Sequence, residues 1–189
     1  MQAIDNALLR ALVRIGQDRP ELLPLVRGVT ELGGSAWLVP LTLAVAALVF
    51  LRGHRRHAAA LLLVTSGGRL LVELLKWWTG RARPDLVDYQ VTVHSLSFPS
   101  GHAANSLIVY LALALIVAPM FGPARWAVVI AVVAAVLIGL TRPILGVHWP
   151  SDVLAGWALA LAWTLAATWS LAKWTRRGDP RTAPPPISG

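Results

Sequence analysis

The stretch TRPILGVHWPSD (residues 141–152) is the most informative part of this sequence, because it places an arginine, a histidine and an aspartate between two long apolar segments. A loop that only joined two membrane helices would need turn residues but no such set. Asp152 follows His148 by four residues, about one helical turn, so its carboxylate can accept a hydrogen bond from one ring nitrogen and leave the other free to attack an electrophile. Arg142 adds a planar set of donors that suits phosphate oxygens. Alone, the stretch fits either a salt-bridged membrane loop or part of a phosphate site.

The apolar segments on either side belong to a set of runs that predict membrane-spanning helices. Hydrophobic residues make up 56% of the 189 residues, charged residues only 14%, and the mean hydropathy is +0.62. These values indicate an all-α integral membrane protein, a polytopic transmembrane helical bundle. About five spans are expected, at residues 35–51, 58–78, 102–120, 124–140 and 151–174. The fourth is expected to end before Arg142, because Pro143 disfavours helical geometry at the residue that precedes it.

The two ends of the chain differ from these spans. Residues 1–34 predict an amphipathic arm, in which apolar residues recur at helical spacing against polar ones such as Asp5, and a second short helix runs to about Leu32. Both helices are expected to lie in the membrane interface. We therefore predict one membrane-embedded domain, residues 1–175, followed by a disordered cytoplasmic tail at 176–189 that is basic and then proline-rich.

The formal net charge of +8 is explained by membrane topology better than by nucleic acid, because the basic residues cluster beside apolar segments, where anionic lipid headgroups lie. With five alternating spans, the basic loops after the first, third and fifth spans fall on one side, which the positive-inside rule makes cytoplasmic. Loops 79–101 and 141–151 then face outward together. We expect a cell-membrane protein, of the inner or plasma membrane, whose site faces the extracytoplasmic side. The chain has no cysteine, which excludes disulfides and thiolate metal sites.

The second predicted span carries Arg69, Glu73 and Lys76 at i, i+4 and i+7, and therefore on one helix face. Charged groups inside a membrane usually turn towards a bundle interior or a wet cavity. Arg69 and Glu73 are expected to form a buried ion pair there.

Lys76 differs from these two because it opens the stretch KWWTGRARP, residues 76–84. Lys76 and Arg83 can converge on one anion if the chain turns at Gly80. Arg81 is expected to contact a lipid headgroup or to lie on the surface.

The stretch FPSGH, residues 98–102, begins the third span. Gly101 lets the backbone approach a ligand closely, and the N–H groups of Ser100, Gly101 and His102 lie at a helix N-terminus, where anions bind. The Ser100 hydroxyl can bind the anion or merely cap the helix. His102 would lie beside the anion and could protonate a leaving oxygen.

Together, these three stretches supply cations, N–H donors and two histidines on one membrane face, a set that suits phosphoryl transfer. No carboxylate cluster suited to Mg²⁺ accompanies them, so we expect a metal-free reaction through a covalent intermediate, without a cofactor. The candidate catalytic residues are His148, His102 and Asp152. The candidate phosphate-binding residues are Lys76, Arg83, Ser100, Gly101 and Arg142.

The three stretches resemble the motifs of the type 2 phosphatidic acid phosphatase (PAP2) family, which are K-x6-R-P, P-S-G-H and S-R-x5-H-x3-D. They match in order between residues 76 and 152, with Thr141 in place of the serine as the sole departure. The resemblance implies a helical core that is shared with vanadium-dependent haloperoxidases. It implies His148 as a nucleophile that forms a phosphohistidine, Asp152 as its orienting partner, and His102 as the acid for the leaving group.

The resemblance favours a membrane lipid phosphate phosphatase, with a polyprenyl (undecaprenyl) diphosphate of cell-wall synthesis as the first candidate substrate. Phosphatidylglycerophosphate, phosphatidate and a prenyl-phosphoribose phosphate remain alternatives. A lipid phosphotransferase and a non-enzymatic lipid-binding or transport protein are alternatives of other classes. The expected partners are the lipid phosphate substrate and the bilayer, and the oligomeric state stays open.

Overall fold

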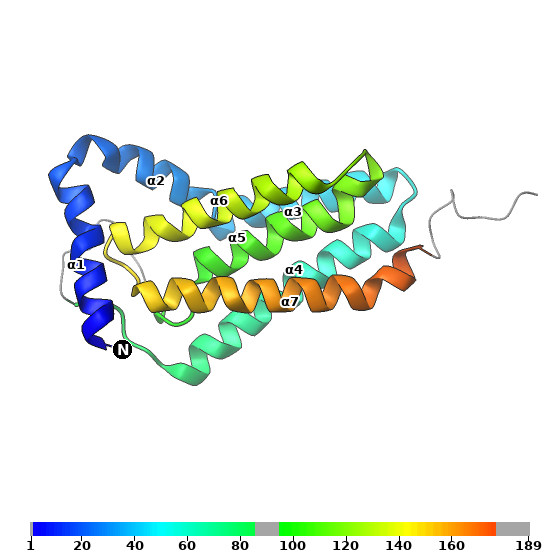
Figure 1. Cartoon of the computed structure of the whole chain (residues 1–189). Coiled ribbons are helices and arrows are strands. Elements are labelled where there is room, and N and C mark those ends of the chain that lie inside the picture. The colour runs from blue at the N-terminus through cyan, green and yellow to red at the C-terminus, as the bar shows by residue number, and fades with distance from the viewer. Residues whose placement is uncertain (1, 86–94, 177–189) are drawn as a thin grey trace, which may run out of the picture.

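The computed structural model describes residues 2–85 and 95–176, and within these residues every regular element is a helix. The elements are α1 (Gln2–Asp18), the 3-10 turn η1 (Pro20–Leu22), α2 (Leu23–Glu31), α3 (Ser35–Leu51), α4 (Arg55–Thr79), α5 (Gly101–Ala112), the π-helical turn η2 (Leu113–Val117), the 3-10 turn η3 (Ala118–Met120), α6 (Arg125–Ile144) and α7 (Pro150–Arg176). Helices α3 to α7 run along a common direction, and α1 crosses one end of this bundle (Figure 1). The predicted all-α fold is confirmed.

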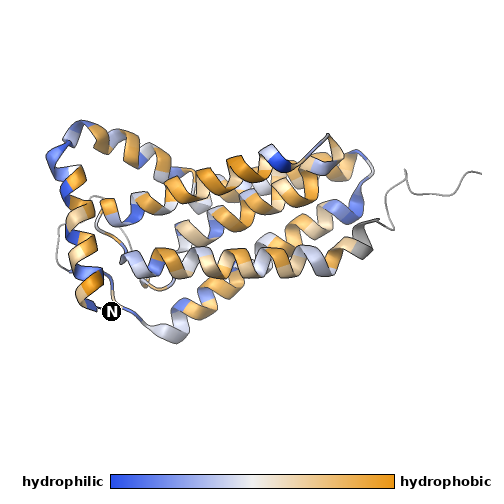
Figure 2. Cartoon of the chain, viewed as in Figure 1, coloured by the Kyte–Doolittle hydropathy of each residue, from blue (hydrophilic) through white to orange (hydrophobic). Residues whose placement is uncertain are grey.

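Within residues 2–85 and 95–176, four helices are long and apolar enough to cross a membrane by themselves. They cover Arg55–Thr79, Gly101–Met120, Arg125–Ile144 and Pro150–Ala172. Residues Pro20–Glu31 and Ser35–Leu51 together form a fifth candidate span that is bent by 40°. Hydrophobic residues make up most of the length of the bundle helices (Figure 2), and many large ones are exposed, among them Leu63, Ile130 and Leu154, as expected for helices that face lipid.

Helix α5 is the centre of the bundle and packs against α4, α6 and α7. Two glycines allow tryptophans of α7 to approach neighbouring helices closely. A Cβ atom at Gly68 would lie 2.9 Å from the Trp163 indole nitrogen, and one at Gly139 would lie 2.3 Å from the Trp157 ring. Both indoles donate hydrogen bonds to backbone carbonyls of the facing helix, Trp163 to Val64 at 2.8 Å. Small residues therefore set the helix spacing here, as is common in membrane bundles.

The end of α6 differs from the prediction. The helix does not stop near Leu140 but continues through Arg142 to Ile144, with Pro143 inside its last turn. A proline removes one helical hydrogen bond and crowds the preceding turn, and this cost is small at a helix end, where most backbone bonds are already made. The extension matters because it fixes Arg142 on a rigid helix.

The N-terminal arm also differs in part. Helix α1 lies across the bundle end (Figure 1), but α2 packs along α6 and leads into α3, so α2 belongs to the bundle. In α1 the buried stripe is Asp5, Leu9, Val13 and Gly16, and the two apolar members cluster with Trp149. Asp5 was expected on the polar face of this helix, opposite the apolar residues, but it lies on the same buried face as Leu9 and Val13 and is only 3% exposed.

The basic turns lie at the end of the bundle opposite to α1 (Figure 1). The Arg52 guanidinium lies 5.7 Å from the centre of the Phe121 ring, which joins the α3–α4 turn to the α5–α6 turn. The tail predicted to be disordered falls, from residue 177 onward, outside the described residues.

Candidate active site

A cavity of about 380 Å³ opens at the end of the bundle that α1 crosses. Its lining includes six of the eight predicted site residues: Lys76, Arg83, Gly101, His102, Arg142 and His148. The other two, Ser100 and Asp152, are fully buried and lie behind this lining. Residues that are distant in the sequence therefore meet in one place, as the motif spacing predicted.

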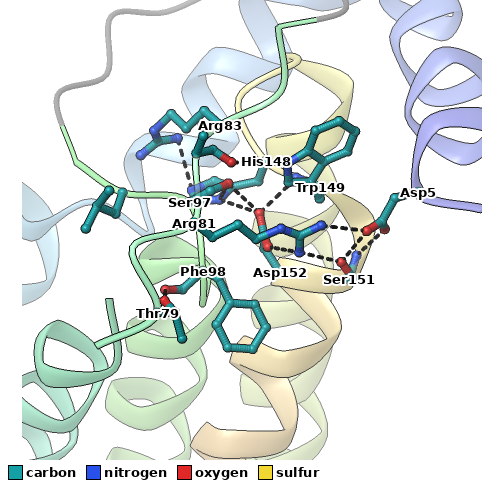
Figure 3. Close-up of polar contacts among 12 residues, drawn as sticks. Asp5, Thr79, Arg81, Arg83, Ser97, Phe98, His148, Trp149, Ser151 and Asp152 are labelled. Carbon is teal, nitrogen blue, oxygen red and sulfur yellow. Dashed lines mark hydrogen bonds and ion pairs between the residues drawn. The ribbon is translucent and has the colours of Figure 1, made fainter. Parts of the chain in front are cut away.

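His148 lies in the loop between α6 and α7 and is 1% exposed. Its Nδ1 atom lies 3.4 Å from Oδ2 of Asp152, which stands in the first turn of α7. Its Nε2 atom lies 3.2 Å from Nη1 of Arg83 (Figure 3). A carboxylate only accepts hydrogen bonds and a guanidinium only donates them, so these contacts assign the proton to Nδ1 and the lone pair to Nε2.

The charge state of His148 follows from its surroundings. Burial lowers the pKa of this imidazole to about 3, and the positive charges of Arg83, Arg142 and Lys76 act in the same direction. The hydrogen bond with Asp152 opposes them without reversing the result. His148 is therefore neutral at physiological pH, which is the state that a nucleophilic nitrogen requires.

Lys76 and Arg83 reach the cavity because α4 ends in a turn that glycine permits. Gly80 adopts a left-handed conformation, with φ of +57°, and its N–H donates to the Lys76 carbonyl at 3.1 Å. Lys76 Nζ donates to the Leu96 carbonyl at 2.7 Å. Arg83 donates to the Val147 carbonyl at 2.6 Å, beside its contact with His148. These contacts hold both cationic side chains at the cavity, where they can face an anion.

Arg142 approaches the cavity from the last turn of α6 and is 3% exposed. Its Nη1 atom donates to Thr30 Oγ1 of α2 at 2.7 Å, and its buried Nε atom has no hydrogen-bond partner among the described residues. The second short helix of the N-terminal arm therefore forms part of the site. Thr30 was missed by sequence reasoning, because nothing local marks one threonine of an apolar helix as an arginine partner.

The start of α5 differs in detail from the predicted anion site. The Ser100 N–H donates to the Asp152 backbone carbonyl at 3.0 Å, so this amide is occupied. The Ser100 hydroxyl does not cap the helix, and its buried oxygen has no partner among the described residues. Gly101 and His102 line the cavity, and His102 packs against the Gly33–Gly34 turn that joins α2 to α3.

Arg81 was predicted to contact a lipid headgroup or to lie on the surface, but its guanidinium is bonded to two buried carboxylates, although 32% of its side chain is exposed. Its Nη1 atom donates to Oδ1 of Asp152 at 2.6 Å and to Ser151 Oγ at 2.8 Å. Its Nη2 atom donates to Oδ2 of Asp5 at 2.8 Å (Figure 3). The local pattern could not reveal these contacts, since Asp5 comes from the far end of the sequence.

Ser97 is a further residue that the motifs did not indicate. Its hydroxyl donates to Oδ2 of Asp152 and lies 3.4 Å from Nδ1 of His148. The Trp149 N–H donates to the same oxygen at 3.0 Å. The carboxylate that orients His148 is thus held by several donors besides the imidazole.

The expected ion pair between Arg69 and Glu73 does not form in the described structure. Arg69 donates instead to Ser35 Oγ of α3 at 2.8 Å, and Glu73 lines the cavity beside Lys76. A hydroxyl of the neighbouring helix α3 therefore takes the place of the expected carboxylate.

A cavity lined by three fixed cationic side chains next to a neutral and oriented imidazole can bind a phosphate and attack its phosphorus. Its position at the end of a membrane-spanning bundle gives access to substrates that are themselves lipids. This combination defines the class of membrane-embedded lipid phosphatases.

Comparisons with known proteins identify the family within this class. The family model described as "PAP2 superfamily" matches residues 56–176, and the chain belongs to this family. It is 39% identical over 165 residues to "Phosphatidylglycerophosphatase B" of Bacillus subtilis, which covers 85% of this chain and 80% of the relative. It is 33% identical over 168 residues to "Decaprenylphosphoryl-5-phosphoribose phosphatase" of Mycobacterium tuberculosis, covering 84% and 81%.

A solved structure agrees with this assignment. The crystal structure of a transmembrane PAP2 type phosphatidylglycerolphosphate phosphatase from Bacillus subtilis matches with a TM-score of 0.80 and 36% identity. The match covers 91% of this chain and 86% of that one. The chain is thus a multi-pass membrane lipid phosphatase of the PAP2 superfamily.

Proposed function

We propose that this enzyme hydrolyses the terminal phosphomonoester of a glycerophospholipid, with phosphatidylglycerophosphate as its best substrate. The observation that carries this proposal is the similarity to phosphatidylglycerophosphatase B over most of both chains. The polyprenyl diphosphate that the sequence first suggested is less well supported than this alternative, since the two relatives named above act on other lipids.

The charges around the cavity support a monoester with a hydroxyl-bearing headgroup. Glu31 of α2 and Glu73 of α4 line the same cavity as Lys76, Arg83 and Arg142. The three cations suit one phosphate, while carboxylates repel a second phosphate and accept hydrogen bonds from headgroup hydroxyls. The second phosphate of a diphosphate would add negative charge next to the two carboxylates, whereas a glycerol headgroup would add hydroxyl groups that donate hydrogen bonds to them.

In the proposed reaction, Nε2 of His148 attacks the phosphorus, so that an N–P bond forms as the P–O bond to the lipid breaks. Protonated His102 gives its proton to the leaving oxygen, and Asp152 stabilises the positive imidazole ring. Neutral His102 then takes a proton from water, whose oxygen attacks phosphorus. The N–P bond breaks, and phosphate leaves.

Lys76, Arg83 and Arg142 stabilise the oxygens of the phosphoryl group during both steps. The Nε donor of Arg142 supports this role, because it has no acceptor among the residues that the structure describes, and a buried donor without an acceptor is costly unless a ligand supplies one. The N–H groups of Gly101 and His102 at the start of α5 add to the anion site, with Ser100 behind them.

We further propose that the site faces the extracytoplasmic side of the cell membrane. The basic turns lie at the end of the bundle opposite to the cavity, and the positive-inside rule assigns such turns to the cytoplasm.

Phosphate release by the purified protein from a panel of lipids in detergent micelles tests the substrate. The panel holds phosphatidylglycerophosphate, phosphatidate, a prenyl-phosphoribose phosphate and a polyprenyl diphosphate. We expect the highest kcat/KM for phosphatidylglycerophosphate. A higher value for the diphosphate would overturn the substrate proposal, and release from no lipid would overturn the hydrolase mechanism. Mass analysis of the products separates hydrolysis from transfer to another lipid.

A further inference from the structure

Asp5 and Arg81 have no role in the reaction described so far, yet they contact its most buried carboxylate through a continuous set of hydrogen bonds (Figure 3). Both Asp5 and Asp152 are nearly or completely buried, at 3% and 0% exposed. Arg81 lies between them and binds one carboxylate with each terminal nitrogen. Burying charges is costly, so a network of three buried or half-buried charges calls for an explanation.

We propose that Arg81 and Asp5 are positioning residues for phosphoryl transfer: Arg81 fixes the orientation of the Asp152 carboxylate, and Asp5 of the N-terminal helix offsets the charge of Arg81. This inference rests on the proposed mechanism, in which Asp152 stabilises the positive His148 ring.

The first part of the proposal follows from the two oxygens of Asp152. Oδ1 accepts from Arg81 Nη1 at 2.6 Å, while Oδ2 accepts from Ser97 and Trp149 and faces His148. The guanidinium is planar and rigid, so it holds the carboxylate plane as well as its position. Asp152 is completely buried, so in the folded protein Arg81 rather than water satisfies Oδ1.

The second part follows from the net charge. A lone Arg81 against Asp152 would form a neutral pair, and a neutral pair stabilises a positive imidazole poorly. Asp5 contributes a second negative charge 2.8 Å from the other nitrogen of Arg81, so the three groups together carry a net charge of −1. Asp152 can then be held by a cation and still present a negative charge to His148.

Asp5 is itself held in its charged form at the start of α7. It accepts hydrogen bonds from the Ser151 N–H at 3.0 Å and from the Ser151 hydroxyl at 2.6 Å. Although burial raises it, the pKa of Asp5 is lowered overall by these bonds and by Arg81. Helix α1 is therefore attached directly beside Asp152, through a residue that lies one position before it in the sequence.

The experiment compares Asp5→Asn, which removes the charge but keeps the size, with Asp18→Asn, the same change at an exposed position of the same helix. Phosphate release from phosphatidylglycerophosphate gives kcat and KM, orthovanadate inhibition reports the anion cavity, and thermal unfolding reports the fold. We expect Asp5→Asn to lower kcat roughly tenfold, with little change in KM or vanadate inhibition, and to lower the unfolding temperature because a buried ion pair is lost. Asp18→Asn should behave as the unmodified protein. Equal kcat values for the two variants would overturn the proposal.

Two further variants separate positioning from a merely structural attachment of α1. Asp5→Glu restores the charge and should recover most of the lost kcat. In an Asp152→Ala background, Asp5→Asn should lower the residual rate no further, because the group that it acts through is gone. A full additional loss in that background, or no recovery with glutamate, would show that Asp5 acts through the fold alone.

Arg81→Lys provides the test should Asp5→Asn not fold. Lysine keeps one charge but cannot hold two carboxylates in a fixed plane, so kcat should fall while vanadate still inhibits. Its matched control is Arg10→Lys, at an exposed position of α1. An unchanged kcat in Arg81→Lys would overturn the positioning role. If the unmodified protein hydrolysed no lipid phosphate, the proposed function itself would be wrong. If the unmodified protein were active and every variant kept its kcat, only the positioning role would be wrong.

Discussion

Helix α6 carries one arginine near each of its ends, and the two have opposite surroundings. Arg125 opens the helix, is exposed, and lies 5.9 Å from the centre of the Trp126 ring. Arg142 stands in the last turn, is 3% exposed, and is bonded to the Thr30 hydroxyl. An exposed arginine such as Arg125 is typical of the basic residues that set membrane topology. The buried guanidinium of Arg142 is bonded to a neutral hydroxyl, which leaves its positive charge able to attract an anionic ligand. A high number of arginines at one end of the bundle is therefore not enough to identify a phosphate-binding site.

The histidines show the same contrast. His148 is buried, oriented by Asp152 and surrounded by cations, while His54 lies in the turn between α3 and α4 at the opposite end. Burial and hydrogen-bond partners, rather than residue type, distinguish the two ends of the bundle. Four predictions test it.

The largest effect is expected for His148→Ala. Without the nucleophile, we expect phosphate release to fall by roughly 10⁴-fold or more. Orthovanadate binding should persist, because the three cations remain. The matched change His54→Ala should leave kcat within a factor of about two. Full activity in His148→Ala would contradict the mechanism and leave lipid binding without catalysis as the better interpretation.

Arg142→Gln and Arg125→Gln compare the two ends of α6 directly. Removing one donor to a phosphoryl oxygen typically costs about 10²- to 10³-fold in kcat, so we expect a loss of this order for Arg142→Gln. Arg125→Gln should change kcat little. Steady-state phosphate release at saturating lipid measures both, and equal losses would show that the two arginines do not differ in function.

A smaller effect is expected on stability as the pH falls. The pKa of His148 is near 6.5 in the unfolded chain and lowered to about 3 in the folded protein, chiefly by burial. Between these values the unfolded state binds the additional proton, so stability is lost as the pH falls from about 6.5 towards 3. We expect the unfolding temperature to drop less over pH 7 to 5 in His148→Gln than in the unmodified protein. Identical drops would indicate that His148 titrates normally.

The smallest effect is expected for chelation of metal ions. The cations that face the phosphate are side chains, and the described residues hold no cluster of three or more His, Asp or Glu side chains placed to bind a metal. Activity should therefore remain within about twofold in excess EDTA. A strict dependence on added Mg²⁺ would show that the cavity needs a cation beyond Lys76, Arg83 and Arg142.

Much of the site could be predicted because each motif acts over a short stretch of chain. The spacing of His148 and Asp152 is about one helical turn, and Gly80 turns the chain so that Lys76 and Arg83 approach one cavity, as expected. Local reasoning failed where a distant acceptor was available. Arg69 bonds Ser35 of another helix instead of Glu73, and Arg81 turns inward to two carboxylates instead of outward to lipid.

By itself, the sequence determined the all-α fold, the apolar helices and most of the residues that gather around one cavity, because hydropathy and motif spacing are properties of contiguous residues. Only the tertiary structure decided which groups support them. Asp5 meets Arg81 across 76 residues, and Arg142 meets Thr30 across 112. Such contacts depend on how α1 and α2 pack against the bundle, and no local pattern records this packing.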